Sequence, residues 1–273
     1  MSIISNIKLG DSYNPSKIGL RKYQKDDNIL FREPGVWVIN GNDVNKCRQM
    51  LIDLIPHALS KFDLIATFGT SNDVTSLDSN IASPGQSFVR QDASSLEFVM
   101  ERQYNLFHSR KQNNQGCPQM FVVLYQSFSS LLKTPAVDFL MTKGREFGMN
   151  CLILSNNLSE FNQEPLECID VIFQMNAPNP DSRERQILYD AMVGMDMQYK
   201  NRLMSYFITD VENGCLVFSK NELQWYKVDD LQEHDLSKFK RTELNLPGPP
   251  QYPSFESLLA KYKEVSQALT TKE

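Results

Sequence analysis

The residues that could bind phosphate lie between a short apolar run, residues 36–39, and a helix-like pattern of apolar residues. Aligned on Lys46, residues 40–47 read Asn-Gly-Asn-Asp-Val-Asn-Lys-Cys. A phosphate-binding loop has the pattern G-x-x-x-x-G-K-[ST], in which the glycines let backbone N–H groups face the phosphate and the hydroxyl holds Mg²⁺. Lys46 keeps the lysine of this pattern, and Gly41 lies one place from its first glycine.

The departures from this pattern remove most of its chemistry. Asn45 stands at the second glycine position, where its side chain takes up phosphate space. Cys47 replaces the hydroxyl residue, and Mg²⁺ prefers oxygen ligands. Asp43 adds a negative charge where the phosphate would lie. We interpret residues 40–47 either as a decayed phosphate loop or as an ordinary strand–helix junction with a surface lysine, and the single matched position favours the junction.

A second candidate position follows the most apolar strand of the chain. Residues 120–124 (MFVVL) are continuously apolar, which is typical of a parallel strand buried on both faces. In a phosphate-loop NTPase such a strand ends in an Asp that reaches Mg²⁺, commonly followed by a catalytic acid. Tyr125 and Gln126 occupy these positions, and neither holds a divalent cation as a carboxylate does or readily accepts a proton. We expect no catalytic acid and no metal site here.

The elements that must position these residues alternate between strand and helix from residue 36 to residue 192, which predicts an α/β protein with a mainly parallel sheet flanked by helices. The expected strands are 36–39, 62–67, 120–124, 151–154 and 171–175, followed by a hairpin of 215–218 and 223–226. The expected helices lie around 96–107, 129–147, 183–192 and 198–207. In the second of these, Pro135 should stand in a first turn and Gly148 should end the helix. In the third, Ser182 should serve as a simple N-cap.

Ligands of parallel sheets bind at the carboxyl ends of the strands. Four side chains should converge there: Lys46, Gln126, Asn156 and Asn157. This set would form a pocket with hydrogen-bond donors and few acids.

The composition excludes several classes of function. No apolar run approaches the roughly 20 residues that span a bilayer, and the N-terminus lacks the form of a signal peptide. The five cysteines are odd in number and widely spaced, which favours reduced thiols, and the three histidines are scattered, so zinc is not expected. A net charge of −5 argues against a generally basic nucleic-acid surface but leaves local basic patches open.

Three parts of the chain are distinguished by composition. Residues 1–30 form a polar arm, 31–245 the α/β domain, and 246–273 a Pro-rich linker followed by an amphipathic helix. This last helix, expected over 254–270, would pack on its own domain or, alternatively, dock on a partner.

Several segments occur in the order found in one family of ATPases. They are the loop 40–47, Gly69-Thr70 after the second strand, Gln103 on a helix, the strand 120–124, Arg145 in the basic segment 142–150, the strand 151–154, and the late segments 169–173 and 212–227. From residue 31 to residue 227 the chain therefore resembles the genome-packaging ATPases of large DNA viruses, of the poxvirus and iridovirus type, in the FtsK/HerA class of P-loop NTPases.

This resemblance implies a RecA/FtsK-HerA-like core with a C-terminal β-hairpin and an appended helix. It also implies that Arg145 takes the place of an arginine finger and that Asn156 or Asn157 takes the place of a polar sensor; an ordinary helix-end cation is the alternative for Arg145. Family members translocate DNA as ATP-driven rings. The resemblance places the chain in a virion or at a viral factory in the host cytoplasm, without secretion or membrane contact.

The departures at Asn45, Cys47, Tyr125 and Gln126 fall on the chemistry of this family. Our first hypothesis is a catalytically degenerate relative without a cofactor, which serves with protein partners, as a homo- or hetero-oligomer, in a virion or packaging complex. The second is an active packaging motor that binds ATP and Mg²⁺ in an unorthodox site, with acids from loops such as Asp73, Asp78 or Asp92. A weaker third is a nucleic-acid adaptor that uses residues 17–25 or 238–241.

Overall fold

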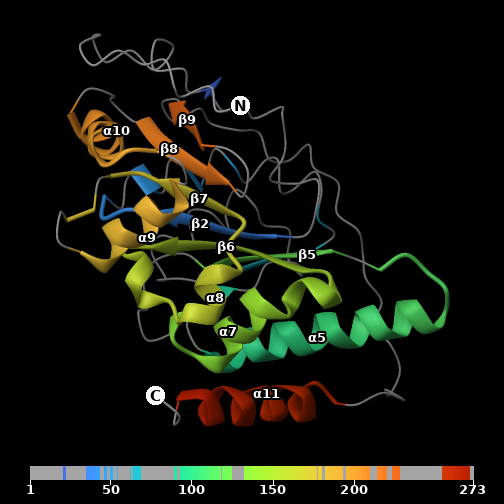
Figure 1. The fold of residues 1–273 in the computed structure, drawn as a ribbon. Helices are drawn as coiled ribbons and strands as arrows, with labels where there is room; N and C mark the ends of the chain where they lie inside the picture. Colours follow the sequence, from blue (N-terminus) through green and yellow to red (C-terminus); the bar gives the residue numbers. More distant parts are fainter. Residues whose placement is uncertain are drawn as a thin grey trace.

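One sheet organises the molecule, and β2 (Val36–Asn40) lies near its centre. The computed structural model describes residues 21–22, 35–43, 46–47, 50–51, 54, 62, 64–68, 89–90, 93–117, 119–124, 132–176, 178–179, 182–192, 195–209, 214–219, 223–227 and 254–270. Within these residues the sheet has nine strands in the order β1-β9-β8-β7-β2-β6-β5-β3-β4 (Figure 1). The strands besides β2 are β1 (Arg21–Lys22), β3 (Leu64–Phe68), β4 (Val89–Arg90), β5 (Met120–Leu124), β6 (Met149–Ser155), β7 (Val171–Gln174), β8 (Gly214–Ser219) and β9 (Leu223–Lys227).

The register of the parallel strands brings three carboxyl ends together. β2 pairs in parallel with β6 and with β7, so Asn40 lies opposite Ser155 on one side and Gln174 on the other. β8 and β9 form the predicted antiparallel hairpin, which adds to the sheet beside β7. The polar residues that end β2, β6 and β7 therefore lie side by side at the carboxyl ends of these strands.

Helices cover the sheet as the alternation of its side chains requires. Val36 and Val38 of β2 face a core that contains residues of several helices. Trp37 and Ile39, on the opposite face, pack with the helical residues Cys47, Met50, Leu51 and Leu54. The helices of the described chain are α5 (Ala93–Gln112), α7 (Pro135–Thr142), η3 (Gly144–Phe147), η4 (Leu158–Glu160), α8 (Gln163–Glu167), α9 (Arg183–Ala191), α10 (Met197–Thr209) and α11 (Phe255–Thr270).

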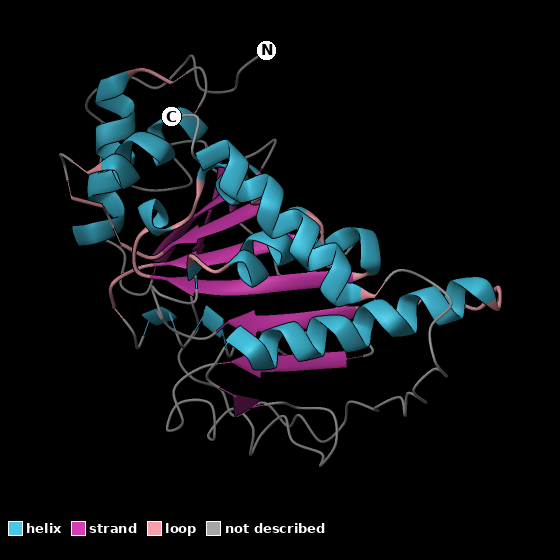
Figure 2. Cartoon of the chain, turned by 90° about the horizontal axis from the view of Figure 1, so that it is seen from below, coloured by secondary structure: helices cyan, strands magenta, loops and turns pink. Residues whose placement is uncertain are grey.

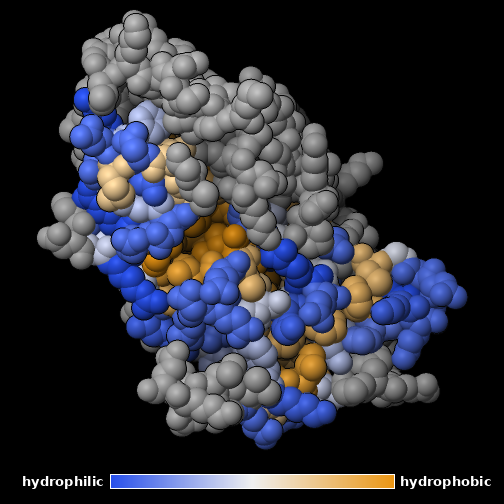
Figure 3. Space-filling view, viewed as in Figure 1, coloured by the Kyte–Doolittle hydropathy of each residue, from blue (hydrophilic) through white to orange (hydrophobic). Residues whose placement is uncertain are grey.

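The figures show this layering directly. The strands lie side by side in one layer, with helices lying across it (Figure 2). In the space-filling view, hydrophilic side chains cover much of the outer surface of the described helices, and apolar side chains show in a hollow over the middle of the sheet (Figure 3).

The predicted strands and most predicted helices are confirmed, with shifts of a few residues at their ends. In place of the helix expected over 129–147, α7 begins at Pro135, which occupies the first turn as predicted, and is followed by the 3₁₀ helix η3. Gly148 then has a φ of 70°, a left-handed conformation that suits glycine and ends the segment where we predicted. Ser182 caps α9 by accepting a hydrogen bond from the Arg185 N–H at 3.2 Å.

The C-terminal helix α11 packs on its own domain, the first of the two alternatives for this segment. Its Phe255 and Leu259 are buried, and its Tyr262 meets the ring of Phe139 edge to face, with 5.5 Å between ring centroids. The Tyr262 hydroxyl also lies 3.1 Å from Thr142 Oγ1. α11 therefore lies against α7 and beside α5 (Figure 1).

Candidate functional site

The loop that carries Lys46 begins at the carboxyl end of β2 and stays bound to the sheet. The Gly41 N–H donates to the Ser155 carbonyl at 2.9 Å, and the Met175 N–H donates to the Asn40 carbonyl at 2.8 Å. The first residues of the loop thus extend the pairing of β2 with its two neighbours. This anchoring holds the loop close to the strand ends.

Backbone N–H groups in this loop already have acceptors inside the protein. The Asn42 N–H donates to Asn176 Oδ1 at 2.9 Å. Asp43 caps the following helical turn, because its Oδ1 accepts from the Lys46 N–H at 3.2 Å and its carbonyl accepts from the Cys47 N–H at 3.0 Å. In a working phosphate loop backbone N–H groups of this region face phosphate oxygens. Here the Asn42 and Lys46 N–H groups face oxygens of Asn176 and Asp43.

The loop also packs closely around Gly41. A Cβ atom added there would lie 2.7 Å from Asn176 Oδ1 and 2.8 Å from Met175 Cβ. Cys47 completes the contact, since its thiol donates to the Gly41 carbonyl at an Sγ–O distance of 3.5 Å. Burial, helped by the negative charge of Asp43, raises the pKa of the Cys47 thiol to about 12, so the thiol stays neutral at physiological pH.

A buried polar network lies behind the loop and joins it to α9. Asn40, which is fully buried, donates from Nδ2 to Gln174 Oε1 at 2.7 Å and to Glu184 Oε1. Gln174 donates from Nε2 to the Asn176 carbonyl at 2.5 Å. The network therefore runs from the first turn of α9, through the ends of β2 and β7, to the residue that binds the Asn42 N–H.

Glu184 is the one ionisable member of this network. Burial raises the pKa of its carboxyl group, and the charge of Glu160 acts in the same direction. Hydrogen bonds from Asn40, from the Leu158 backbone and from Gln174 partly offset this effect. The site thus contains a carboxyl group that is held by three elements and faces the protein interior.

Sequence reasoning missed this network. It treated Asn40 as a lost glycine and did not single out Gln174 or Glu184. A signal was present, because Asn40 and Gln174 are polar residues at the ends of strands that are otherwise apolar. Such residues need hydrogen-bond partners when they are buried.

Three of the four residues of the predicted polar cluster lie among the described residues. Lys46 is partly exposed and Asn156 is exposed, while Asn157 uses its Oδ1 to accept from the Ser159 N–H at 2.9 Å and so caps η4. Gln126, Tyr125 and Asn45 lie outside the described residues. Of the expected set, Lys46, Asn156 and Asn157 are found at the carboxyl ends of β2 and β6.

Arg145 lies at the amino ends of β2 and β7, whereas Lys46 follows the carboxyl end of β2. Its Nη2 lies 2.7 Å from Asp170 Oδ2 and 3.1 Å from the Cys168 carbonyl oxygen. The same Asp170 oxygen accepts from the Val36 N–H at 2.9 Å. In this position Arg145 ties η3 to the start of β2, and its side chain is one-third exposed.

Among the described residues, no group of three or more His, Cys, Asp or Glu side chains could hold a metal ion. No disulfide joins the five cysteines, all of which fall within the described residues.

In the described part of the chain, no helix combines the length and apolar character required to span a membrane.

Solved structures of two packaging enzymes and of one further ATPase are similar to this chain. The DNA-packaging ATPase B204 of Sulfolobus turreted icosahedral virus aligns with a TM-score of 0.50 and 13% identity, over 72% of this chain and 99% of that one. The genome-packaging NTPase B204 of Sulfolobus turreted icosahedral virus 2, in complex with sulfate, aligns at 0.49 and 13%, over 74% and 98%. ATPases 2 and 3 of EssC from Geobacillus thermodenitrificans align at 0.49 and 12%, over 87% and 45%. No family model and no curated protein matches the chain.

At this identity the likeness to the first B204 structure defines the fold. The chain has the α/β fold of a P-loop NTPase, with a mainly parallel sheet and flanking helices. This confirms the fold class that the sequence predicts.

Proposed function

We propose that the chain is a catalytically degenerate relative of the genome-packaging ATPases of large DNA viruses, and that it serves as a structural or interaction component of a virion or packaging complex. The observation that carries this proposal is the closed loop at the end of β2. Its Asn42 and Lys46 N–H groups donate to Asn176 and Asp43 rather than toward open space.

Binding of a triphosphate would have to reverse these contacts. Each internal hydrogen bond contributes on the order of 1 kcal/mol, and a phosphate would also meet the negative charge of Asp43. Mg²⁺ would lack both its usual hydroxyl ligand, because Cys47 is a neutral buried thiol, and an acid after β5, where the sequence reads Tyr125-Gln126. These costs favour a chain that keeps the fold and does without the nucleotide.

Isothermal titration calorimetry with ATP, with and without Mg²⁺, tests the proposal. The wild type is compared with Lys46→Ala, and Lys261→Ala serves as a matched control because Lys261 is exposed on α11, far along the chain from the loop. We expect no binding heat in any of the three proteins and no phosphate release above background. ATP binding that Lys46→Ala abolishes and Lys261→Ala keeps would overturn the proposal, and dependence on Mg²⁺ would identify an active motor with acids brought from loops.

The interaction role implies contacts with other proteins of the same particle, and assembly into an oligomer is part of the proposal. A location in the virion or at the viral factory in the host cytoplasm follows from this role. DNA contact is possible but is not indicated by the net charge of −5.

A further inference from the structure

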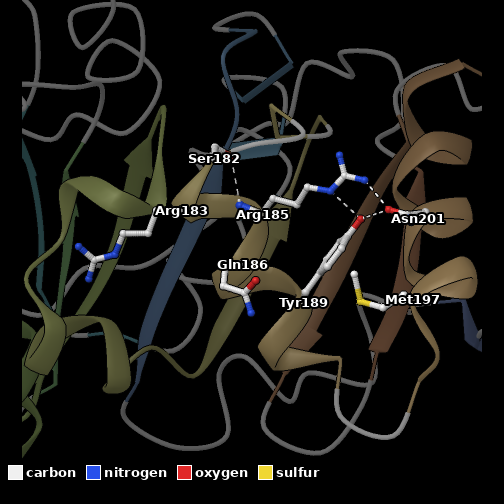
Figure 4. A pocket seen from close by; sticks show the side chains of 7 residues that line it. All are labelled: Ser182, Arg183, Arg185, Gln186, Tyr189, Met197 and Asn201. Atoms are coloured by element: carbon white, nitrogen blue, oxygen red, sulfur yellow. Dashed lines mark hydrogen bonds between the residues drawn. The ribbon is translucent and has the colours of Figure 1, made fainter.

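The pocket between α9 and α10 contrasts with the closed loop because it presents cations to solvent. It has a volume of about 600 Å³ and is lined by seven described residues: Ser182, Arg183, Arg185, Gln186, Tyr189, Met197 and Asn201 (Figure 4). Two of these carry guanidinium groups and none carries a carboxylate. Arg183 points away from the others and donates to Gln163 Oε1 at 3.3 Å, so Arg185 is the cation that lies with Tyr189 and Asn201 (Figure 4). In a chain of net charge −5, this is a local concentration of positive charge.

Arg185 is held in place by its neighbours. Its Nε donates to the Tyr189 hydroxyl at 2.6 Å, and its Nη2 donates to Asn201 Oδ1. The guanidinium carbon also lies 5.0 Å from the centroid of the Tyr189 ring, a cation–π contact. The remaining nitrogen points away from both Tyr189 and Asn201 (Figure 4). A guanidinium fixed in this way loses little side-chain entropy when it binds an anion.

Further groups strengthen the positive potential. Lys200 donates from Nζ to the Tyr189 carbonyl at 2.6 Å and lies 5.8 Å from the same ring. The nearest acidic residues in sequence have other partners: Glu184 accepts from Asn40 Nδ2, Asp190 accepts from Gln186 Nε2 at 2.7 Å, and Asp196 caps α10 by accepting from the Tyr199 N–H at 2.8 Å. None of the three lines the pocket.

An apolar residue stands beside these cations. Met197 is 57% exposed, and among the described residues only Phe98 is a comparably exposed large apolar side chain. Methionine adapts its shape to different apolar partners and is common on binding surfaces. The space-filling view shows apolar side chains among hydrophilic ones around α10 (Figure 3).

These features fit a protein segment better than a nucleic acid. The Tyr189 ring is only 4% exposed and is covered by two cations, so it offers no surface on which a base could stack. A nucleic-acid backbone would need a longer track of cations than one pocket provides. A carboxylate matches the free edge of Arg185, and an adjacent apolar side chain matches Met197.

We propose that the α9–α10 pocket binds an acidic segment of a partner protein, with a carboxylate on Arg185 and a neighbouring apolar side chain on Met197. This goes beyond the proposed function, because it holds whether or not the loop at β2 binds nucleotide. A failure of this proposal can be distinguished from a failure of the proposed function. Calorimetry with ATP tests the loop that contains Lys46, and peptide binding tests the pocket between α9 and α10.

A display library of random short peptides, selected on the full-length wild-type protein, tests the proposal. Enriched peptides are then synthesised with a fluorophore, and their affinities are measured by fluorescence anisotropy. We expect Asp or Glu next to a large apolar residue in these peptides. Arg185→Ala should weaken their binding about tenfold through loss of a charge-assisted hydrogen bond, and Met197→Ser about threefold through loss of apolar contact.

Arg202→Ala is the matched control, because Arg202 is exposed on α10 and does not line the pocket. It should leave the affinity unchanged. Arg185→Ala also removes contacts to Tyr189 and Asn201, so Met197→Ser, which removes no hydrogen bond of this network, keeps the test decisive if Arg185→Ala unfolds. Peptides without acidic residues, or affinities equal in all variants, would contradict the proposal. Binding of a labelled DNA oligonucleotide that Arg185→Ala abolishes, in the absence of enriched peptides, would identify a nucleic-acid site instead.

Discussion

The closed loop after β2 and the α9–α10 pocket lie on either side of α9, and adjacent residues of that helix serve them. Glu184 is 6% exposed and turns into the protein, where it accepts from Asn40 behind the loop. Arg185 turns toward the pocket, where Tyr189 and Asn201 hold its guanidinium group. One helix therefore supports the loop after β2 through Glu184 and lines the α9–α10 pocket through Arg185.

The comparison separates two uses of polar side chains. Around the loop, donors and acceptors meet inside the protein, so they contribute to the free energy of folding and leave little for a ligand. In the pocket, cations are positioned by the protein but keep one side toward solvent. Substitutions around the loop should change stability, and substitutions in the pocket should change binding.

The largest expected effect is at Asn40. Asn40→Ala removes both hydrogen bonds from Nδ2 and leaves the buried Gln174 and Glu184 without this donor. We expect a loss of about 3 kcal/mol in the free energy of unfolding, measured by urea denaturation at pH 7. Asn42→Ala is the control, because the Asn42 side chain is exposed and only its backbone N–H bonds to Asn176. Equal stability of the two variants would mean that the network does not hold the loop.

Gly41 gives a second, smaller effect that depends on the loop being closed. The Cβ of Gly41→Ala would lie 2.7 Å from Asn176 Oδ1, closer than unbonded atoms allow, so Asn176 would have to move. We expect a loss of about 2 kcal/mol by the same urea measurement. Gly116→Ala is the matched control, since nothing lies within 4 Å of an added Cβ there. A neutral Gly41→Ala would indicate an open loop and would reopen the question of nucleotide binding.

The sequence predicted the sheet well because buried parallel strands have a clear local signature. The run at β5 is apolar throughout, and those at β2 and β7 are apolar up to their last residues, Asn40 and Gln174. Pro135 begins α7 and Gly148 ends η3 through the dihedral angles that these residues favour. These signals act within a few residues, so they survive in a single sequence.

The site was less predictable because its contacts join residues far apart in the chain. Asn40 and Glu184 are 144 positions apart, and no local pattern indicates that they meet. The departures from the phosphate-loop pattern at Asn45 and Cys47 were visible in the sequence, but the hydrogen bonds from the Asn42 and Lys46 N–H groups to Asn176 and Asp43 were not. Arg145 could be matched to a place in a family pattern. Its ion pair with Asp170 could not be predicted, because it forms only when the fold brings η3 next to the residue before β7.

The third and smallest effect concerns the charge of Glu184. Burial raises its pKa in the folded protein above the ordinary value of about 4.3 for the unfolded chain. Folding therefore favours the protonated form: the contribution of Glu184 is fully present below about pH 4.3 and is lost as the pH rises through the folded-state pKa. At pH 8 the buried carboxylate is a cost that a neutral amide of the same size would avoid.

Glu184→Gln removes this cost and keeps one carbonyl oxygen that can accept from Asn40 Nδ2. We expect the variant to exceed the wild type by about 1 kcal/mol in free energy of unfolding at pH 8, with the difference shrinking toward pH 4.5. Urea denaturation across this range measures it, and Glu264→Gln, at an exposed position of α11, is the control. If the difference were independent of pH, Glu184 would already be neutral throughout, and the network would be held by hydrogen bonds alone. If the variant were less stable at pH 8, the charged carboxylate of Glu184 would stabilise the positions of Asn40 and Gln174. The charge of Glu184 would then contribute to the stability of the network instead of reducing it.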